Sequence, residues 1–379
     1  MKFIPRDELH SRALHARNRF YKRTKLRRRQ AARRRKAKSE LRDAIQQQMA
    51  FVERYGLHPP PHRDRVPILL PEVLSLRDNR SAVLSAINQI RRQVLIHERR
   101  VYLYFNHVRV LEPAATLLLV AEIFRCKIVR PGRGGGSVLG NYPSSREVYA
   151  QLCDMGFYSL LRVQADQFSP AGILKPDRPL FLPFKTQVSV RPGLAAMFVR
   201  LVTRGAFAMA ELAQNRMTAA LKEAMGNAHE HAYDRPTELP FLPHRWWIAG
   251  HLDPRNNEMM ILILDLGIGI PNHLKPSLYE QVCAIFDWSA TPSDGAMIRA
   301  ATELYRTSTG QEGRGKGFRD MKRFIDVCDD GELRVLSNRG SYTYRKNELE
   351  SFADHDTSIG GTLIEWRVRH AAVAEISDD

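Results

Sequence analysis

The sequence predicts an α/β protein with three parts: a basic helical arm, a small α/β domain, and a C-terminal domain whose mixed, mostly antiparallel sheet is backed by helices. Three observations lead to this prediction. Lys and Arg crowd the N-terminus, strand-like and helix-like segments alternate in the middle, and strand-like segments joined by short polar turns dominate the last third. We expect the arm at residues 1–60, the α/β domain at 61–183 and the last domain at 184–379.

The charge of the chain is concentrated in the arm. The chain has 379 residues and a formal net charge of +17, and residues 1–50 contain 17 Lys and Arg against 4 Asp and Glu, a balance of +13. The remaining residues therefore carry only 17 − 13 = +4. Residues 11–55 contain neither Gly nor Pro and have few apolar positions, which favours a helix that lies in solvent or on a polyanion.

The densest basic run, KLRRRQAARRRKAK at 25–38, predicts contact with a nucleic-acid backbone, because Lys and Arg release the counterions of phosphates. Such contacts are insensitive to base sequence. An anionic membrane surface, an acidic protein and a solvated charged helix are the alternatives. The residues expected to contact phosphate are Arg27, Arg28, Arg29, Arg33, Arg34 and Arg35.

The composition favours a soluble, cytoplasmic protein. Hydrophobic residues make up 44% of the chain, enough for a full core, yet no run approaches the ~20 apolar residues of a membrane span. The N-terminus is charged from Lys2 onward and has no apolar signal-peptide region. The four cysteines are scattered without a CxxC pair, so we expect reduced thiols rather than disulfides or zinc ligands.

The middle of the chain predicts alternating strands and helices. Residues 99–110 are expected to form a buried strand, and residues 112–126 a helix with a wide apolar face. A Gly-rich loop follows. Residues 145–161 are expected to form a helix that begins after Ser145, a good N-cap residue, and ends near Gly156.

The last part predicts a long helix and a set of strands. The helix, at about 194–233, is expected to break near Gly205. The short polar turns DPRNN and NRG indicate antiparallel neighbours with helices on one face of the sheet. The expected strands are 245–253, 258–267, 332–338, 341–347 and 361–369.

The motif DLGIGIP (265–271) places an acid at the end of an apolar strand, with two glycines after it. Asp265 is well placed to accept a hydrogen bond. Gly267 and Gly269 allow a positive φ and a close approach of the backbone to a flat ligand. An ordinary connection from a strand into a turn is the alternative.

The motif GRGKGF (313–318) precedes a segment predicted to be a helix. Main-chain N–H groups of Gly313, Gly315 and Gly317 at a helix start attract an anion, and Lys316 adds a cation, which together suit a polyphosphate. The spacing is neither the Rossmann GxGxxG nor the P-loop GxxxxGK[ST]. A flexible loop is the alternative.

The motif EAMGNAHEHAY (223–233) places Glu223 and Asn227 four residues apart, on one face of a helix. A carboxylate there accepts a proton from water, and an Asn oxygen one turn later holds Mg²⁺, which prefers oxygen ligands. A solvated polar pair is the alternative. His229 and His231 point to different faces of a helix, so we do not expect them to share a metal ion.

These signals occur in one order: ExxxNAxxHA, DxGxGI, GxGKGF, and a Gly-Gly-Thr strand at 360–362. The set resembles the GHKL ATP-binding superfamily, which includes DNA gyrase, heat-shock chaperones, mismatch-repair proteins, sensor histidine kinases and anti-sigma-factor kinases. The resemblance covers about residues 186–370. It implies a Bergerat-type α/β sandwich that binds ATP together with Mg²⁺.

The resemblance also implies a role for each motif residue. Glu223 becomes the catalytic base that polarises the attacking water, and Asn227 the ligand of the ATP-bound Mg²⁺. Asp265 receives the adenine amino group, with support from Thr362. Residues 272–312 become the mobile lid over ATP. The remaining expected nucleotide contacts are Gly267 and Gly269 at base and ribose, Gly313, Gly315, Lys316 and Gly317 at the phosphates, and one of Thr307, Ser308 or Thr309 in the lid.

A weaker resemblance, over about residues 67–165, links the segment VYLYFNHVRVLEPAATLLLVAEIFR to the STAS interaction domains. In regulatory STAS domains a phosphoacceptor Ser stands about where this chain has Ala114. Thr116 lies near but is expected to face elsewhere on the helix. The resemblance therefore implies a domain that binds a protein partner and is not itself phosphorylated.

The sequence argues against two classes of the superfamily. The chain ends about ten residues after the last expected strand, without the further domain that gyrase-like and mismatch-repair members need. His97 and Glu98 lack the Pro that follows the phosphoacceptor of histidine kinases. The remaining neighbour is the anti-sigma type, an ATPase domain that phosphorylates a small STAS domain.

The leading expectation is an ATP-binding, Mg²⁺-dependent ATPase that acts as a nucleotide-driven switch. Its partners are expected to be a protein at the STAS-like domain and nucleic acid at the arm, and a homodimer is one option for its assembly. One alternative is a serine/threonine kinase that acts in trans on a STAS partner. Another is an interaction scaffold that does not hydrolyse ATP.

Overall fold

The computed structural model of the protein divides the chain into two compact units, residues 1–67 and residues 68–379. In the first unit, residues 49–55 are helical. The structure describes residues 43, 46, 49–60, 64–131, 136–163, 179–205, 209–236, 239–273, 292–307 and 317–369, without the side chains of 201–205 and 304–307.

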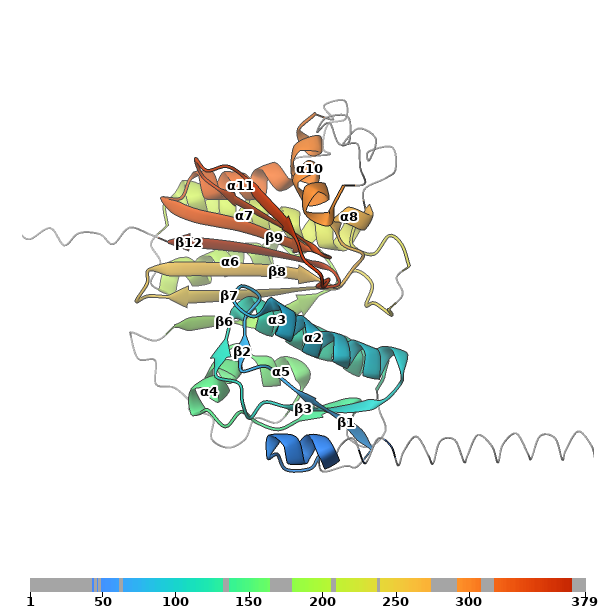
Figure 1. Ribbon diagram of the computed structural model, residues 1–379. Coiled ribbons are helices and arrows are strands. Elements are labelled where there is room, and N and C mark those ends of the chain that lie inside the picture. Colours follow the sequence, from blue (N-terminus) through green and yellow to red (C-terminus); the bar gives the residue numbers. More distant parts are fainter. Residues whose placement is uncertain are drawn as a thin grey trace, which may run out of the picture. The chain divides into compact units, whose positions relative to one another are not determined.

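A large antiparallel sheet dominates the second unit. Within the described residues it has seven strands in the order β11-β10-β9-β12-β8-β7-β6 (Figure 1), and every neighbouring pair is antiparallel. The expected antiparallel sheet is therefore confirmed. Its strands are β6 (Leu180–Gln187), β7 (Trp246–Asp253), β8 (Glu258–Asp265), β9 (Asp330–Ser337), β10 (Gly340–Arg345), β11 (Ser351–Asp354) and β12 (Thr362–Arg369).

One face of this sheet, called here the helix face, packs against α6 (Pro192–Gly205), α7 (Glu211–Glu230) and α11 (Gly317–Asp326), as Figure 1 shows. Alternate residues of the central strands, such as Ile261 and Ile263 of β8, join the helices in one buried apolar cluster. The break expected near Gly205 is confirmed, since α6 ends there and α7 begins at Glu211.

The apolar residues of α7 have helical spacing and form a stripe toward the sheet. The helix ends at Glu230, and the N–H of the next residue, His231, donates to Asn227 O over 3.0 Å. Packing along the stripe fixes the rotation of the helix, so that the polar residues beside the stripe keep a defined direction. The buried members are Ala213, Met217, Ala220, Leu221, Ala224, Met225 and Ala228.

The N-terminal part of the second unit is a small α/β arrangement (Figure 1). Its described strands form a sheet in the order β1-β3-β5 and a parallel pair of β2 and β4. The elements are β1 (Arg65–Leu69), of which Ile68 and Leu69 belong to this unit, β2 (Val73–Leu74), α2 (Arg80–Arg91), the π-helical η1 (Arg92–Ile96), β3 (Arg100–Tyr104), β4 (Val110–Leu111), α3 (Pro113–Val129), β5 (Val138–Gly140), α4 (Arg146–Asp154) and α5 (Phe157–Leu161).

Local sequence signals explain two of these helices. Pro113 stands at the first position of α3, where a missing N–H costs nothing. Ser145 caps α4, because its Oγ accepts a hydrogen bond from Val148 N over 3.3 Å. The helices expected after residues 112 and 145 are thus confirmed, with Gly156 (φ 72°) separating α4 from α5.

The strand expected over residues 99–110 is too long. β3 ends at Tyr104, and a turn follows in which Val108 N donates to Phe105 O over 3.1 Å. Asn106 and His107 interrupt the apolar run at this turn, and the chain pairs again only at β4.

The second face of the large sheet, called here the outer face, is covered by α3. The Phe124 ring of α3 lies 6.2 Å from the Trp247 ring of β7, and the Arg245 guanidinium lies 5.2 Å from the same Phe124 ring. Trp247, Leu262 and Leu264 point to this face and are fully buried. The sequence indicated helices on one face only. The continuous apolar run of β8 reflects burial on both faces.

Strand β6 joins the two parts of the unit. It pairs with β7, and Phe184 N donates to Met155 O over 2.8 Å, at the end of α4. The boundary expected between residues 183 and 184 falls inside this strand. The division into a STAS-like and a Bergerat-type domain stays a prediction.

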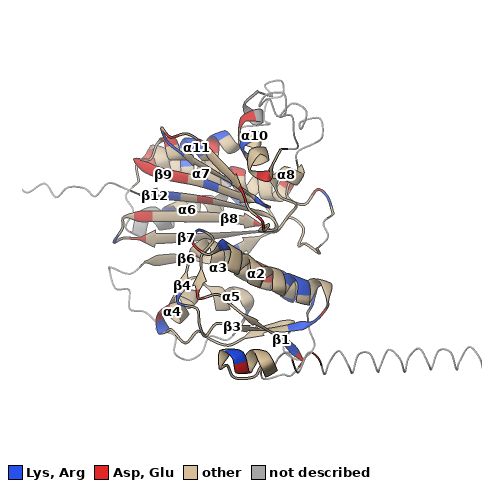
Figure 2. Ribbon diagram, in the orientation of Figure 1, with Lys and Arg blue, Asp and Glu red and all other residues tan. Residues whose placement is uncertain are grey.

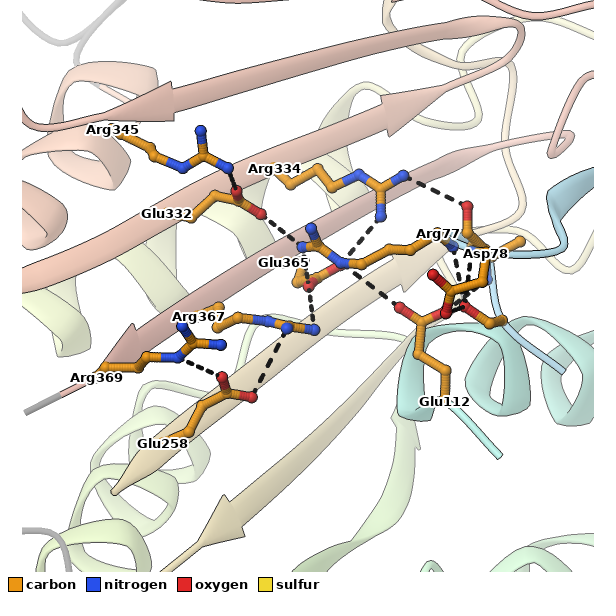
Figure 3. Close-up of polar contacts among 12 residues, drawn as sticks. Arg77, Asp78, Glu112, Glu258, Glu332, Arg334, Arg345, Glu365, Arg367 and Arg369 are labelled. Carbon is orange, nitrogen blue, oxygen red and sulfur yellow. Dashed lines mark hydrogen bonds and ion pairs between the residues drawn. The ribbon is translucent and has the colours of Figure 1, made fainter. Parts of the chain in front are cut away.

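Charged side chains also cross between the two parts, on the outer face of β9 and β12 (Figure 3). Arg77, from the turn before α2, donates to Glu365 over 2.6 Å and to Glu332 over 2.5 Å. Glu365 is almost fully buried. Figure 2 shows acidic and basic residues near one another on the large sheet, as expected for a body with little net charge.

Two further sequence expectations concern the whole chain. Cys126, Cys153 and Cys328 are free thiols, while Cys283 lies outside the described residues. None of the helices in the described part of the chain combines the length and apolar character needed to cross a membrane.

Candidate functional site

Glu223 and Asn227 lie beside the buried stripe of α7, on the side that meets α11. Both side chains are half-buried. Burial, and after it the charges of Asp320 and Glu230, raise the pKa of the Glu223 carboxyl. A carboxylate with a raised pKa is a better proton acceptor near neutral pH. Glu223 therefore has the surroundings that suit a general base.

Gly317, the first residue of α11, lies directly against this pair. A Cβ atom on Gly317 would lie 3.1 Å from Glu223 Oε2 and 3.4 Å from Asn227 Nδ2. The backbone at the start of α11 thus lies in close contact with the two polar side chains, which would have to shift slightly to admit a Cβ atom. The structure brings together two motifs that are about ninety residues apart in the sequence.

Asp265 ends β8 and is buried, with 6% of its surface exposed. Its Oδ1 accepts a hydrogen bond from Gly267 N over 2.9 Å, and Thr362 of β12 is its partner in the strand register. Burial raises the pKa of Asp265 to about 7, although hydrogen bonds from Gly267 and Thr362 oppose the shift. A donor that reached this carboxyl would favour its charged form.

The turn after Asp265 needs its glycines for packing against the protein itself. A Cβ atom on Gly267 would lie 2.0 Å from Ala232 O, the same oxygen that accepts a hydrogen bond from Ile268 N over 2.8 Å. Gly269 has a φ of 81° and lies against the Asn338 side chain. These contacts place the turn against the end of α7. The approach of a ligand to these glycines stays a prediction.

Thr362 belongs to a buried hydrogen-bonded group. Its Oγ1 lies 3.1 Å from Ser337 Oγ, which also accepts a hydrogen bond from Ile270 N over 2.8 Å. Gly361 has a φ of 148°, and a Cβ atom on it would lie 2.1 Å from Asp265 O. The Gly-Gly-Thr segment is therefore packed against the end of β8, as its expected supporting role requires.

Three side chains of this site were not predicted from the sequence. Tyr233 Oη accepts a hydrogen bond from Leu266 N over 3.3 Å and donates to Arg245 O. Asn338 Nδ2 donates to Ile268 O over 2.9 Å, and Ser337 holds Thr362 as described above. In the sequence, Tyr233 is marked only as the last residue of the EAMGNAHEHAY motif, and Ser337 and Asn338 only as a polar pair before the turn at Gly340.

The histidines at the end of α7 have separate neighbours. The His229 ring lies 4.8 Å from His244, and the His231 ring lies 4.6 Å from His273 of α8 (Ile270–His273). His273 Nδ1 in turn lies 2.9 Å from Asp234 Oδ2. The two rings thus diverge as helical spacing predicts. Among the described residues no three or more His, Cys, Asp or Glu side chains form a group that could hold a metal ion.

The described part of the expected lid is attached to the β10–β11 hairpin. α10 (Asp294–Thr307) begins with Asp294, whose Oδ2 accepts a hydrogen bond from Arg339 N over 2.8 Å. Gly295 N donates to Asp354 Oδ1 over 3.0 Å. The mobility of the lid stays a prediction.

In α3, neither the residue at the expected phosphoacceptor position nor the nearby threonine reaches the surface. Ala114 and Thr116 are fully buried. Thr116 Oγ1 donates to Glu112 O over 2.9 Å, within the same helix turn. The hydroxyl of Thr116 is therefore occupied and inaccessible to a phosphoryl donor.

Several predicted residues lie outside the described part of the chain. They are Gly313, Gly315 and Lys316 of the Gly-rich loop, Ser308 and Thr309 of the lid, the side chain of Thr307, and Arg27, Arg28, Arg29, Arg33, Arg34 and Arg35 of the arm.

Comparison of the sequence with models of known protein families and with curated proteins finds no match. The resemblance to the GHKL superfamily therefore rests on the sequence motifs and stays a prediction.

Proposed function

We propose that the protein binds ATP with Mg²⁺ and hydrolyses it, as a member of the GHKL superfamily. One observation carries the proposal: Gly317 lies against Glu223 and Asn227. A base, an oxygen ligand for Mg²⁺ and the last glycine of a Gly-rich loop at a helix start are the parts that phosphoryl transfer to water needs. In this proposal Glu223 activates the water, and Asn227 holds the metal of Mg-ATP.

Asp265 is the proposed adenine-binding group. A buried carboxyl whose pKa stands near 7 gains from a hydrogen-bond donor, because such a donor stabilises the carboxylate. The exocyclic amino group of adenine is such a donor, and guanine has a carbonyl oxygen at the same place. Asp265 therefore supports a preference for ATP over GTP.

The proposed role of turnover is a switch between the nucleotide site and the small α/β part. The Gly360–Gly361–Thr362 segment touches both. A Cβ atom on Gly360 would lie 3.0 Å from the Arg91 guanidinium of α2, while Gly361 and Thr362 pack at Asp265. A structural change at the adenine end of the site would thus be transmitted to α2 through the direct contacts of this segment.

The burial of Thr116 and Ala114 favours an ATPase over a kinase that acts on its own STAS-like part. The kinase alternative in trans keeps the same ATP site and differs only in the acceptor. Transfer of label from ATP to a partner protein, rather than to water, would distinguish it.

For the arm we propose contact with nucleic-acid phosphates. The balance of +13 in residues 1–50 supports this part of the proposal. Binding through phosphates weakens steeply as salt rises and is equal for unrelated base sequences. A fluorescence titration of nucleic acid at several salt concentrations, with the full chain and with a chain lacking residues 1–50, tests it.

The decisive experiment for the proposal measures ATP affinity. Asp265→Asn is expected to weaken ATP binding by about tenfold or more, which corresponds to about 1.4 kcal/mol. The matched control is Asp253→Asn. Asp253 is the last residue of β7, far along the strand from Trp246, which pairs with Asp265. Its Oδ1 likewise accepts a main-chain hydrogen bond, from Arg255 N over 3.0 Å. Equal ATP affinity in wild type and Asp265→Asn overturns the proposed adenine site.

A further inference from the structure

Two arginines meet where the small α/β part contacts the outer face of the large sheet. Arg80 is the first residue of α2, and Arg334 lies in the middle of β9. Arg80 Nη2 donates to Thr357 O over 3.4 Å, and Arg334 Nη2 donates to Leu76 O over 3.5 Å. Both distances are at the long limit of a hydrogen bond. The two guanidinium groups are thus held only weakly by main-chain oxygens.

Three further nitrogen atoms of these groups lack a hydrogen-bond partner. Arg80 Nε, Arg80 Nη1 and Arg334 Nη1 are buried and make no hydrogen bond with any described residue. Arg334 Nη1 lies 3.8 Å from Glu365 Oε2, which is too far for a hydrogen bond. Burying charged donors without partners is costly. This arrangement therefore indicates a counter-ion.

The neighbouring Arg77, by contrast, forms short hydrogen bonds with carboxylates. Arg77 reaches Glu332 and Glu365 over 2.5 and 2.6 Å (Figure 3). Glu365 is also 3.5 Å from Arg367. Arg334 therefore shares Glu365 with Arg77 and Arg367, and its Nη1 is 3.8 Å from Glu365 Oε2, whereas Arg80 has no carboxylate within ion-pair distance among the described residues.

His355 and Ser341 complete the polar surroundings. His355 Nε2 and Ser341 Oγ lie 3.0 Å apart, and His355 N donates to Arg339 O. Burial lowers the pKa of His355, and the charges of Arg80 and Arg334 lower it further, while Asp354 and Asp356 oppose this. The shift from the two arginines shows that their positive field reaches the imidazole.

The charge of Arg80 persists at neutral pH. Burial and the nearby Arg334 lower its pKa to about 10, which leaves the guanidinium protonated. Arg334 Nη1 and Arg80 Nη1 are donors with a fixed planar geometry. Such donors match tetrahedral oxyanions, which accept several charge-assisted hydrogen bonds at once.

We propose that Arg80 and Arg334 bind a phosphate group, as the free ion or on a small phosphate monoester, between the small α/β part and the outer face of the sheet. Ser341 and His355 offer further hydrogen bonds at its edge. This site is separate from the proposed ATP site. Leu333 and Val335 face the helix-covered core that includes α7, so Arg334 between them points to the opposite face.

The test is a calorimetric titration and a thermal unfolding series with inorganic phosphate and with glycerol phosphate, each against chloride at matched ionic strength. Wild type is expected to bind phosphate with one strong site and to unfold at a higher temperature in phosphate. Arg80→Gln and Arg334→Gln are expected to lose at least about tenfold in affinity and to lose the thermal shift.

Two control variants test whether any loss of phosphate binding is specific to Arg80 and Arg334. Arg92→Gln changes an exposed arginine next to the end of α2, and Asn227→Ala changes the proposed ATP site. Both variants are expected to bind phosphate as wild type does. Without phosphate, Arg80→Gln is expected to unfold at the wild-type temperature or above, because it removes a buried charge that has no carboxylate partner. Arg334→Gln is expected to unfold at the wild-type temperature or slightly below, because it also takes the ion-pair partner from Glu365 Oε2.

The outcomes separate cleanly. Equal binding of glycerol phosphate identifies a phosphate monoester site, and binding of inorganic phosphate alone identifies a site for the free ion. Wild type that responds to phosphate no more than to chloride overturns the proposal. So does full retention of the phosphate response in Arg80→Gln and Arg334→Gln. Loss of the response in Asn227→Ala, with retention in the arginine variants, would assign the phosphate to the ATP site instead.

Discussion

Arg91 of α2 donates a hydrogen bond from Nη2 to the main-chain oxygen of Ile359, three residues before Thr362. Its Nε donates to the buried carboxylate of Glu122 over 3.0 Å, and Arg125 donates to the same carboxylate from the other side. These two arginines lower the pKa of Glu122 despite its complete burial. The contact ties the small α/β part to the strand that supports the candidate adenine site.

Replacing Arg91 with Ala is expected to lower the free energy of unfolding by about 3 kcal/mol, because it leaves part of a buried carboxylate without its partner. Arg92→Ala is the matched control, since the neighbouring Arg92 is exposed. Its effect is expected to stay within about 0.5 kcal/mol. Denaturant unfolding of the three proteins provides the comparison, and equal stability of Arg91→Ala and wild type would show that the buried network contributes little.

The raised pKa of Asp265 predicts a pH dependence of stability. Its pKa is about 7 in the folded protein and 3.8 as the ordinary value. Between these values the folded state holds a proton that the unfolded state releases, so this group's contribution to stability is greatest below about pH 4 and falls as the pH rises through about 7.

Asp265→Asn removes that proton equilibrium. The stability of wild type relative to Asp265→Asn is therefore expected to fall by about 1.4 kcal/mol per pH unit between pH 5 and about 7, and to stay constant above the folded pKa. Unfolding curves of both proteins at several pH values measure the difference. A constant difference across this range would mean that the carboxyl ionises normally in the folded protein.

Replacement by Ala is expected to have opposite effects on stability at Gly267, in the turn after β8, and at Gly226, inside α7. Gly267→Ala brings a Cβ atom to within 2.0 Å of Ala232 O, so the turn must move, at a cost of about 3 kcal/mol. Gly226 lies inside α7 with nothing within 4 Å of its Cβ position.

Gly226→Ala is therefore expected to stabilise the protein by about 0.5–1 kcal/mol through helix propensity. Thermal unfolding of both variants tests the pair. If both substitutions changed stability alike, the close contact between the turn and the end of α7 would be refuted.

Sequence periodicity and motif order were sufficient to predict those features of the site that lie within a single helix or strand. The apolar spacing of α7 predicted that Glu223 and Asn227 share a face, and the apolar run of β8 predicted that Asp265 ends a strand. The alternation of strands and short polar turns predicted the antiparallel sheet. These features are local, so the sequence contains them directly.

Features that depend on contacts between distant elements were not predictable in this way. Strand β6 was not among the expected strands. It contains Pro183, whose missing N–H is tolerated because β6 is the last strand of the described sheet. The roles of Tyr233, Ser337 and Asn338 depend on turns that only tertiary packing brings together. The cover of the outer face by α3 has no local signal, apart from the absence of alternation in β8.

The central claim is that Glu223 activates water for the hydrolysis of ATP. The most direct measurement follows release of the labelled γ-phosphate of ATP in the presence of Mg²⁺, with wild type, Glu223→Ala and the control Glu211→Ala, which changes an exposed carboxylate in the first turn of the same helix. We predict release by wild type and Glu211→Ala, and a loss of about 100-fold or more in Glu223→Ala with ATP affinity retained. Release by Glu223→Ala at the wild-type rate would contradict the account.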